Sequence, residues 1–269
     1  MHFRYFMFFS TFMKVFSYNL NRNTKNNIKL YHTIKDNKND YINDKDFLLN
    51  KKLITVSPGG YRGFYMFGIG KFIKTNYDLS NYVFTGASAG AWVSLFMSSK
   101  MPMNKFEKYL VMPSLKNLNS ILSMEKTIKN QILSEYTEKD FDLKRLFIGV
   151  TTVSNCKSNS TIFTNFINLE DAIDCCIASS HIPLITGGIN NVYRNVYTFD
   201  GGFSRYPFLH TINSSLDITP YYWDDVNGIK KSRFYTTLLN PGKYNFKELI
   251  EKGFQDSSNN KKYLDEKLQ

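Results

Sequence analysis

The stretch that decides the fold is residues 82–97, which read YVFTGASAGAWVSLFM. Its first four residues are β-branched or aromatic and predict a short strand, whereas Ala91 to Met97 is apolar enough for a buried helix. Between them, residues 86–90 fit the G-x-S-x-G pattern, in which a sharp strand-to-helix turn exposes a serine hydroxyl. Gly86 and Gly90 provide the room for that turn. Ser88 is therefore the candidate nucleophile, placed at a helix N-terminus where the backbone dipole favours developing negative charge.

The same strand-turn-helix order occurs once before this stretch. Leu53 to Ser57 predicts a strand, a glycine loop follows, and Phe64 to Thr75 predicts a helix. Two such units in succession are typical of a parallel sheet in an α/β protein. Further along the chain we expect a helix around Met124–Leu133, strands at Leu146–Val153 and Thr161–Phe166, a helix at Glu170–Ser179, and strands at Arg194–Phe199 and Arg233–Leu239.

Length and composition bound the organisation of the chain. Its 269 residues suit one large α/β domain, and 42% hydrophobic residues, with 23 Phe and 18 Tyr, can fill a sizeable core. Residues 19–50 are dominated by Asn, Lys and Asp without periodicity, which predicts a flexible connector. We therefore expect an N-terminal apolar segment and linker over residues 1–50 and a catalytic body over residues 51–269.

The net charge of +11 favours anionic partners such as a membrane surface, acidic substrates or nucleic acid. The basic excess is spread along the chain, so no concentrated nucleic-acid stripe is present, and we expect no nucleic-acid partner. The chain has only three cysteines, of which two are adjacent, and no Cys/His ligand spacing. This usage predicts a reducing compartment and no structural metal.

The N-terminal segment from Phe3 to Phe16 is rich in Phe and Met. Its uncharged run, Tyr5 to Met13, is too short to span a bilayer. A helix here would be either an interfacial membrane helix or one that packs on the body. A short signal peptide stays open, although no small-residue cleavage site follows. We expect an intracellular protein, cytoplasmic or peripherally membrane-associated. The aromatic face of that helix would consist of Tyr5, Phe9, Phe12 and Phe16.

A serine that attacks an acyl carbon also needs hydrogen-bond donors for the oxyanion, and the loop at residues 57–63, SPGGYRG, is the candidate source. Glycines let main-chain N–H groups approach a substrate, so Gly59 and Gly60 are the expected donors. Arg62 could brace this loop or contact a phosphate. The Lys-Ser/Thr pair of a phosphate-binding P-loop is missing, which argues against nucleotide binding.

The serine needs a base, and only two of the four histidines, His181 and His210, lie in the body. Either could complete a Ser-His-Asp triad, or be an ordinary structural histidine. Asp200 is the other candidate, because it ends an expected strand and is followed by Gly201 and Gly202. A carboxylate held within hydrogen-bond reach of the hydroxyl and partly desolvated can accept its proton. On its own, Asp-Gly is equally typical of a plain turn.

The ordered set Pro-Gly-Gly-x-Arg-Gly at residues 58–63, Gly-Ala-Ser-Ala-Gly at 86–90 and Asp-Gly-Gly at 200–202 resembles the patatin-like phospholipase family. The stretch Ala-Ser-Ser-His-Ile-Pro at 178–183 adds to the resemblance. It implies a three-layer α/β/α sandwich with a mostly parallel central sheet, a Ser88–Asp200 dyad without histidine, and oxyanion donors at Gly59 and Gly60. It implies no metal and no cofactor. The motif residues that support this site are Arg62, Gly63, Gly86, Gly90, Gly201 and Gly202.

The resemblance also carries expectations about activity. It implies a lipid acyl hydrolase acting on phospholipid or acylglycerol esters at a peripheral membrane or lipid-droplet surface, with features closest to the adiponutrin-like branch. Two positions depart from the family pattern: Pro58 replaces a glycine, and Tyr206 precedes Pro207 where asparagine is usual. A catalytically silent lipid-binding or scaffold protein, and a serine hydrolase with a Ser-His-Asp triad, both stay open as alternatives, as does the oligomeric state.

Overall fold

Apolar side chains alternate between the two faces of the central strands. The computed structural model describes residues 29–31, 47–112, 115, 120–154, 157–229 and 245–268. In β2 (Lys52–Val56), Ile54 and Val56 point into the main core, whereas Leu53 belongs to a smaller cluster on the opposite face. β3 (Tyr82–Ala87) repeats this division with Phe84 and Val83. Successive side chains of a strand face opposite ways, so these runs make a sheet that is buried on both faces.

The central sheet is mostly parallel. Its strand order is β1-β5-β4-β3-β2-β8, with β7 pairing to β4 and β6 to β7. The pairs β1–β5, β4–β3, β3–β2 and β2–β8 are parallel, and the pairs β4–β5, β4–β7 and β6–β7 are antiparallel. The remaining strands are β1 (Lys29–Tyr31), β4 (Leu146–Ser154), β5 (Lys157–Phe163), β6 (Asn191–Tyr193), β7 (Val196–Phe199) and β8 (Ser214–Ile218).

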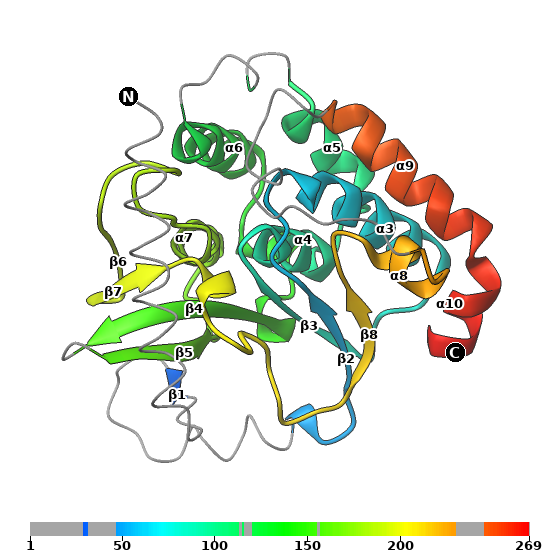
Figure 1. Ribbon diagram of the computed structural model, residues 1–269, viewed down its shortest axis with the longest axis horizontal. Coiled ribbons are helices and arrows are strands. Elements are labelled where there is room, and N and C mark those ends of the chain that lie inside the picture. The colour runs from blue at the N-terminus through cyan, green and yellow to red at the C-terminus, as the bar shows by residue number, and fades with distance from the viewer. Residues whose placement is uncertain are drawn as a thin grey trace.

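Helices pack on the face of this sheet that carries the main core. α4 lies against the centre of the sheet, and α3 and α7 lie on either side of α4 (Figure 1). α6 packs outside α7, and α9 packs outside α3. The mixed α/β class with a mostly parallel sheet is therefore confirmed. The helices are α3 (Gly63–Asn76), α4 (Ala89–Ser98), α5 (Asn104–Leu110), α6 (Ile121–Glu135), α7 (Leu169–Ser179), α8 (Tyr222–Val226), α9 (Phe246–Asn259) and α10 (Lys261–Leu268).

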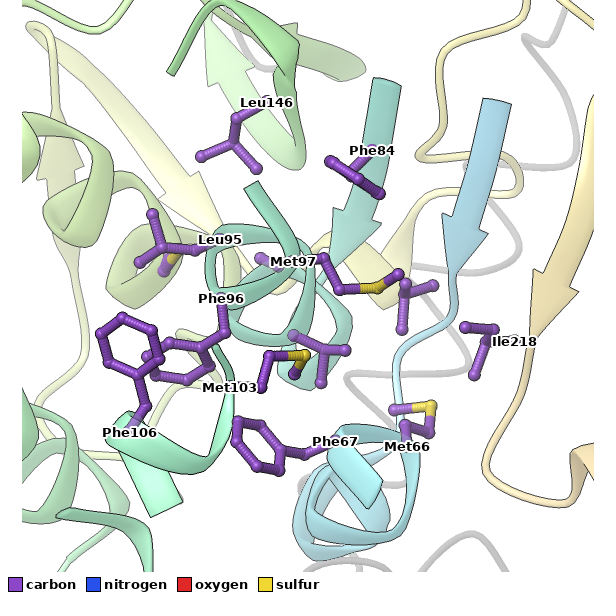
Figure 2. Close-up of a cluster of buried hydrophobic side chains, with 14 of the residues drawn as sticks. Met66, Phe67, Phe84, Leu95, Phe96, Met97, Met103, Phe106, Leu146 and Ile218 are labelled. Carbon is purple, nitrogen blue, oxygen red and sulfur yellow. The ribbon is translucent and has the colours of Figure 1, made fainter. Parts of the chain in front are cut away.

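The main core lies between the sheet and the helices. Figure 2 shows Phe67 of α3, Phe96 of α4 and Phe106 of α5 converging beneath Leu146 and Phe84 of the sheet. The rings of Phe67 and Phe96 meet edge to face with centroids 5.5 Å apart, and those of Phe96 and Phe106 are 5.0 Å apart. Aromatic pairs of this kind add to the stabilisation from buried area. The aromatic content of the sequence is thus used to fix α4, the helix that follows Ser88.

The opposite face of the sheet carries the smaller cluster. Leu53, Val83, Phe147 and Ile162, one from each central strand, pack there with Leu209. The partly buried side chains that cover this cluster are Phe47, Leu48 and Ile212. In the described part of the chain, this face is therefore closed by connecting segments.

The sequence-based elements match the structure where periodicity was strong. The expected strands and helices between Leu53 and Ser179 all form, with ends that shift by a few residues. The strand expected over Arg194–Phe199 forms as β7, but it begins two residues later, at Val196. Arg194 and Asn195 take positive φ values of 46° and 63° and form the turn of a β6–β7 hairpin instead. β8, α5, α8 and α10 are additional elements.

Three expectations concern the ends of the chain. Residues 29–31 of the expected flexible connector form β1, which pairs with β5, so this region contributes an edge strand. The N-terminal aromatic helix over residues 1–18 and the strand over Arg233–Leu239 lie outside the described residues. Within the described ranges, no helix is both long enough and apolar enough to cross a membrane.

Two glycines let α9 approach α3 closely. A Cβ on Gly68 of α3 would collide with the carbonyl oxygen of Ile250, and one on Gly253 of α9 would collide with that of Tyr65. The two helices therefore touch through their backbones. This contact positions Phe246, at the start of α9, on the ring of Phe64 with centroids 4.1 Å apart.

We expect Gly253→Ala to destabilise the protein, although alanine normally favours a helix over glycine by about 0.5–1 kcal/mol. The added methyl group has no space against α3, and overpacking of this kind costs about 1–3 kcal/mol. The measurement is the melting temperature, which should fall by several degrees. Gln255→Ala, an exposed change on the same helix, should leave it nearly unchanged. A raised melting temperature for Gly253→Ala would contradict the close approach.

Candidate active site

Ser88 sits at a strained junction between β3 and α4. β3 ends at Ala87, α4 begins at Ala89, and Ser88 between them has φ 54° and ψ −129°. A residue other than glycine in this conformation costs on the order of 1–3 kcal/mol, and such strain persists only where the surroundings hold it. The serine is placed at the N-terminus of α4, as the sequence indicated. It is also buried, at 7% exposure.

The two glycines of the turn allow three backbone segments to touch. A Cβ on Gly86 would collide with the carbonyl oxygen of Gly90, and a Cβ on Gly90 would collide with that of Val56 in β2. The end of β2, the end of β3 and the first turn of α4 therefore meet without side chains between them. Any larger residue at either position would push α4 away from the sheet.

Ser179, the last residue of α7, fixes the backbone of the nucleophile turn. The Ser88 N–H donates to Ser179 Oγ at 2.8 Å, and that hydroxyl donates to the Gly149 carbonyl in β4 at 2.6 Å. The strained turn is thereby tied to both α7 and the central strand. Ser179 belongs to the 178–183 stretch of the family resemblance, but the sequence alone did not indicate this role.

Asp200 is held on all sides at the carboxyl end of β7. Its N–H donates to the His181 carbonyl at 2.7 Å, and its carbonyl accepts from Thr151 Oγ1 at 2.9 Å. The Gly202 N–H donates to Asp200 Oδ1 at 2.7 Å, and the Ser88 side chain interacts with the carboxylate. The structure thus brings Ser88 and Asp200, which are far apart in sequence, into direct contact.

The electrostatic environment of Asp200 suits a proton acceptor. Burial raises the pKa of Asp200 to about 6, and hydrogen bonds from Ser88 and Gly202 oppose that rise. The carboxylate is therefore ionised at neutral pH, and its affinity for a proton is higher than that of an exposed aspartate. A general base works best when its pKa approaches the working pH.

Ser88 and Asp200 line a cavity of about 90 Å³. A single water needs about 10–15 Å³ by this kind of measure, so the cavity has room for several groups of that size. Its other walls are mainly apolar and come from α3, α4 and α6. They include Phe64, Phe67, Trp92, Val93, Phe96 and Ile128. A concave, mostly apolar cavity with a few convergent polar groups is the usual form of a small-molecule site.

The glycine loop divides between the cavity and the core behind it. Gly60 lines the cavity beside Ser88 and has φ 50°, which a side chain would strain. Gly59 packs behind the loop, where a Cβ would lie 2.6 Å from Met66 Cε, and it is not among the cavity-lining residues. Gly63 also lines the cavity and lies against α4, where a Cβ would be 2.7 Å from that of Ala89.

Arg62 braces this loop. Its Nε donates to the Pro220 carbonyl at 2.5 Å, and its guanidinium lies 4.8 Å from the ring of Tyr65 and 4.6 Å from that of Tyr221. The loop is thereby fixed to the segment that follows β8. Of the two interpretations of Arg62, the structure supports the bracing one.

Gly201 and Gly202 shape the site on the other side of Asp200. A Cβ on Gly201 would collide with the carbonyl oxygen of Gly149 and lie 2.7 Å from Ala87 Cβ. The segment after Asp200 therefore passes directly over β4 and the end of β3. Gly202 turns its N–H back to the aspartate. The three sequence motifs at 58–63, 86–90 and 200–202 thus meet around one cavity.

Neither histidine of the body lines this cavity. His181 is buried, and its Nε2 lies 3.3 Å from the Ile189 carbonyl. His210 is exposed on the segment before β8. Burial lowers the pKa of His181, so it is neutral at physiological pH. The ionisable side chain that interacts with the Ser88 side chain is that of Asp200.

Sequence reasoning missed two further residues of the site. Gly149 interrupts an apolar strand, which is a signal for close approach of another backbone segment. Its carbonyl accepts a hydrogen bond from Ser179 Oγ, and the backbone of Gly201 packs directly against it. Glu125 occupies the apolar stripe of α6 and faces the cavity. A charged residue at a core-facing position of a helix could have indicated this role from the sequence.

Among the described residues, no group of three or more His, Cys, Asp or Glu side chains could hold a metal ion, and the lack of a cofactor stays a prediction.

A strained serine at a strand-to-helix turn of an α/β fold is typical of serine-dependent acyl hydrolases. The model of the family described as patatin-like phospholipase matches residues 54–212. The chain therefore belongs to the patatin-like phospholipase family, and this membership indicates a lipid acyl hydrolase.

Other comparisons are more distant. VipD from Legionella pneumophila is a solved structure that resembles this chain with 13% sequence identity and a TM-score of 0.34. The match covers 63% of this chain and 49% of VipD, so the chain spans about half the length of that protein. A search of curated protein sequences finds no significant match.

The buried Asp200 carboxylate should reduce stability, and Asp200→Asn should remove that cost. The unfolded chain ionises near pH 3.8 and the folded one near 6, so the stability of the wild type falls as pH rises through this window. The loss is on the order of 3 kcal/mol. We expect Asp200→Asn to melt a few degrees higher than the wild type at pH 7, with a smaller difference at pH 4.

The matched control is Asp265→Asn. Asp265 is paired with Lys261 and Tyr77, which lower its pKa, so its removal should slightly lower the melting temperature at pH 7. An Asp200→Asn protein that is less stable than the wild type at pH 7 would contradict the cost assigned to the buried charge.

Proposed function

We propose that this protein hydrolyses fatty acyl esters of phospholipids or acylglycerols through a Ser88–Asp200 dyad. The observation that carries the proposal is that the strained Ser88 and the buried Asp200 carboxylate interact at the wall of one apolar cavity. Membership of the patatin-like phospholipase family supports the substrate class.

The reaction proceeds in two steps. Ser88 Oγ attacks the ester carbonyl carbon while Asp200 accepts the hydroxyl proton, and the tetrahedral intermediate expels the alcohol, which leaves with that proton. Water then attacks the acyl-serine, Asp200 accepts a proton from it, and the fatty acid leaves as Ser88 regains its hydrogen. Both steps use the same carboxylate, so a single buried base is sufficient.

The oxyanion of each step is assigned to the glycine loop and the helix terminus. The Gly60 amide borders the cavity beside Ser88, and Gly59 precedes it in the same loop. α4 begins directly after Ser88, so the positive end of its dipole faces the developing charge. Of the two glycines, Gly60 has the better support because it lines the cavity.

The apolar walls suit a fatty acyl chain. Trp92 and Phe96 of α4 and Phe64 of α3 border the cavity, which leaves little for a polar acyl group to bind. Contact with a lipid surface is part of this proposal. The loop that gives Ile182 to the cavity wall also carries Leu184, which is 60% exposed. An exposed leucine two residues from a cavity-lining residue is favourable where this loop meets lipid.

We expect Ser88→Ala and Asp200→Asn each to lower kcat for a soluble short-chain ester by at least about 10³-fold. The two residues act as one unit, so the double variant should lose little more than either single one. A fluorophosphonate probe should label the wild type and fail to label Ser88→Ala.

Two controls make this test specific. Ser134→Ala, at an exposed serine on α6, should be labelled like the wild type. His210→Ala should keep its activity, and a large loss there would favour a triad over the dyad. A wild-type protein that neither reacts with the probe nor hydrolyses any ester would favour a silent binding protein.

The activity should also depend on the ionisation of Asp200. Its pKa is raised to about 6, and only the carboxylate can accept a proton, so kcat/KM should fall by about tenfold per pH unit below pH 6. The measurement is the pH profile of kcat/KM between pH 4.5 and about 7.5 with a soluble ester. An activity that stays constant down to pH 4.5 would exclude Asp200 as the base.

A further inference from the structure

Glu125 is a second buried carboxyl group at the same cavity as Ser88 and Asp200. It lies on α6, is only 4% exposed, and lines the cavity between Met124 and Ile128. Burying a carboxylate without a cation costs several kcal/mol, so buried acids are rare unless they are paired or protonated. The proposed dyad leaves no part for Glu125, and its presence in the apolar wall needs an explanation.

Hydrogen bonds connect Glu125 to the helices on either side. Trp92 Nε1 of α4 donates to Glu125 Oε1 at 3.0 Å, and the side chain of Ser180 interacts with the same carboxyl group. Ser180 Oγ lies 3.0 Å from the Cys176 carbonyl and donates to it. A hydroxyl has one hydrogen, so when Ser180 donates to the Cys176 carbonyl it can only accept from Glu125. In that arrangement Glu125 can donate to Ser180 only when its carboxyl group carries a proton.

The surroundings favour this protonated form. Burial raises the pKa of Glu125 to about 8, hydrogen bonds with Trp92 and Ser180 oppose the rise, and the charge of Asp200 adds to it. The other ionisable groups that interact with its charge are Tyr61 of η1 (Gly60–Arg62) and Cys176 of α7, and neither is cationic.

The cations on and near α6 are engaged elsewhere or exposed. Lys129 is paired with Glu170 and Asp174 of α7. Lys108 of α5 is paired with Glu135 near the end of α6. The remaining lysine of the helix, residue 126, is on its exposed side.

The two partners of Glu125 are linked to the nucleophile. Trp92 lies four residues after Ser88, which is about one turn along the same face of α4. Ser180 follows Ser179, whose hydroxyl accepts the Ser88 N–H. Glu125 therefore joins α6 to both elements that hold the nucleophile turn.

We propose that Glu125 is a positioning residue that acts as a neutral carboxylic acid, bridging Trp92 and Ser180 and so fixing the cavity wall around Ser88. This inference rests on the proposed function of the site. In this form the cavity holds one negative charge, that of Asp200, when the reaction begins. Ionisation of Glu125 would break its donation to Ser180 and place a second negative charge beside the developing oxyanion, so turnover should fall.

The test compares Glu125→Gln with the wild type in the full-length protein. Glutamine can accept from Trp92 through its oxygen and donate to Ser180 through its nitrogen, and it stays neutral at every pH. We expect the wild-type kcat for a soluble ester to fall by about tenfold per pH unit above pH 8. Glu125→Gln should keep kcat at pH 7 within about threefold of the wild type and lack that fall, because the group that ionises is gone. The control Glu135→Gln, an exposed change on the same helix, should follow the wild type.

A second measurement does not depend on catalysis. The unfolded chain ionises Glu125 near pH 4.5, whereas the folded chain keeps the proton until about pH 8. Wild-type stability should therefore fall relative to Glu125→Gln as pH rises through this window. The melting temperatures should be similar near pH 4.5, and Glu125→Gln should melt higher at pH 8.

The outcomes separate this inference from the proposed function. An identical alkaline fall in Glu125→Gln and the wild type, or a melting difference that does not change with pH, would overturn the neutral bridge. A wild type that hydrolyses no ester would overturn the proposed function, and with it the effect of Glu125 on turnover. In that case the melting temperatures would still support or overturn the protonated bridge itself.

Discussion

The close approach of three backbone segments at Gly86 and Gly90 is the constraint on which the site depends. The end of β2 presses against the first turn of α4 through Gly90, and the end of β3 does so through Gly86. With α4 this near the sheet, the connecting residue Ser88 has φ 54°. The strain is then held by attachments at both ends of the helix. Ser179 binds the Ser88 N–H, and Lys74 Nζ of α3 donates to the Phe96 carbonyl at the C-terminal end, 3.1 Å away.

The site holds two buried carboxyl groups, and burial raises the pKa of both, that of Glu125 more than that of Asp200. The pKa of Asp200 rises to about 6 and that of Glu125 to about 8. At neutral pH the first is ionised and the second keeps its proton. Each lowers the stability of the fold relative to a neutral isostere, because the unfolded chain would ionise both in water. Active sites commonly lower the stability of the fold, because they hold polar groups in environments that are unfavourable for them.

Local patterns in the sequence were enough to predict the centre of the sheet and to propose the main site residues. Ser88 and its glycines form a contiguous motif, and Asp200 stands next to two glycines, so their identity did not need the fold. β8 was not foreseen, because it offers only Leu216 and Ile218 as alternating apolar residues, and it becomes a strand by pairing with β2.

Contacts between distant segments account for the other differences from the sequence-based picture. The positive φ of Arg194 is supported by its ion pair with Asp171 and by its donation to the Thr164 carbonyl. Both partners come from segments far away in the chain, so a continuous strand was the natural interpretation of residues 194–199. Ser179 and Glu125 likewise acquire their roles only when α6, α7 and α4 meet.

The family match ends at residue 212, and the sheet does not. β8, at Ser214–Ile218, covers the outer edge of β2, and α10 packs on β8 while the Tyr82 hydroxyl donates to the Leu268 carbonyl at 3.0 Å. A chain cut at the family boundary would leave β2 with a free row of backbone donors and acceptors next to the nucleophile turn. Such an unpaired edge invites pairing with another chain. The segment beyond the family match therefore covers a sheet edge, next to the candidate active site, that would otherwise be open to pairing.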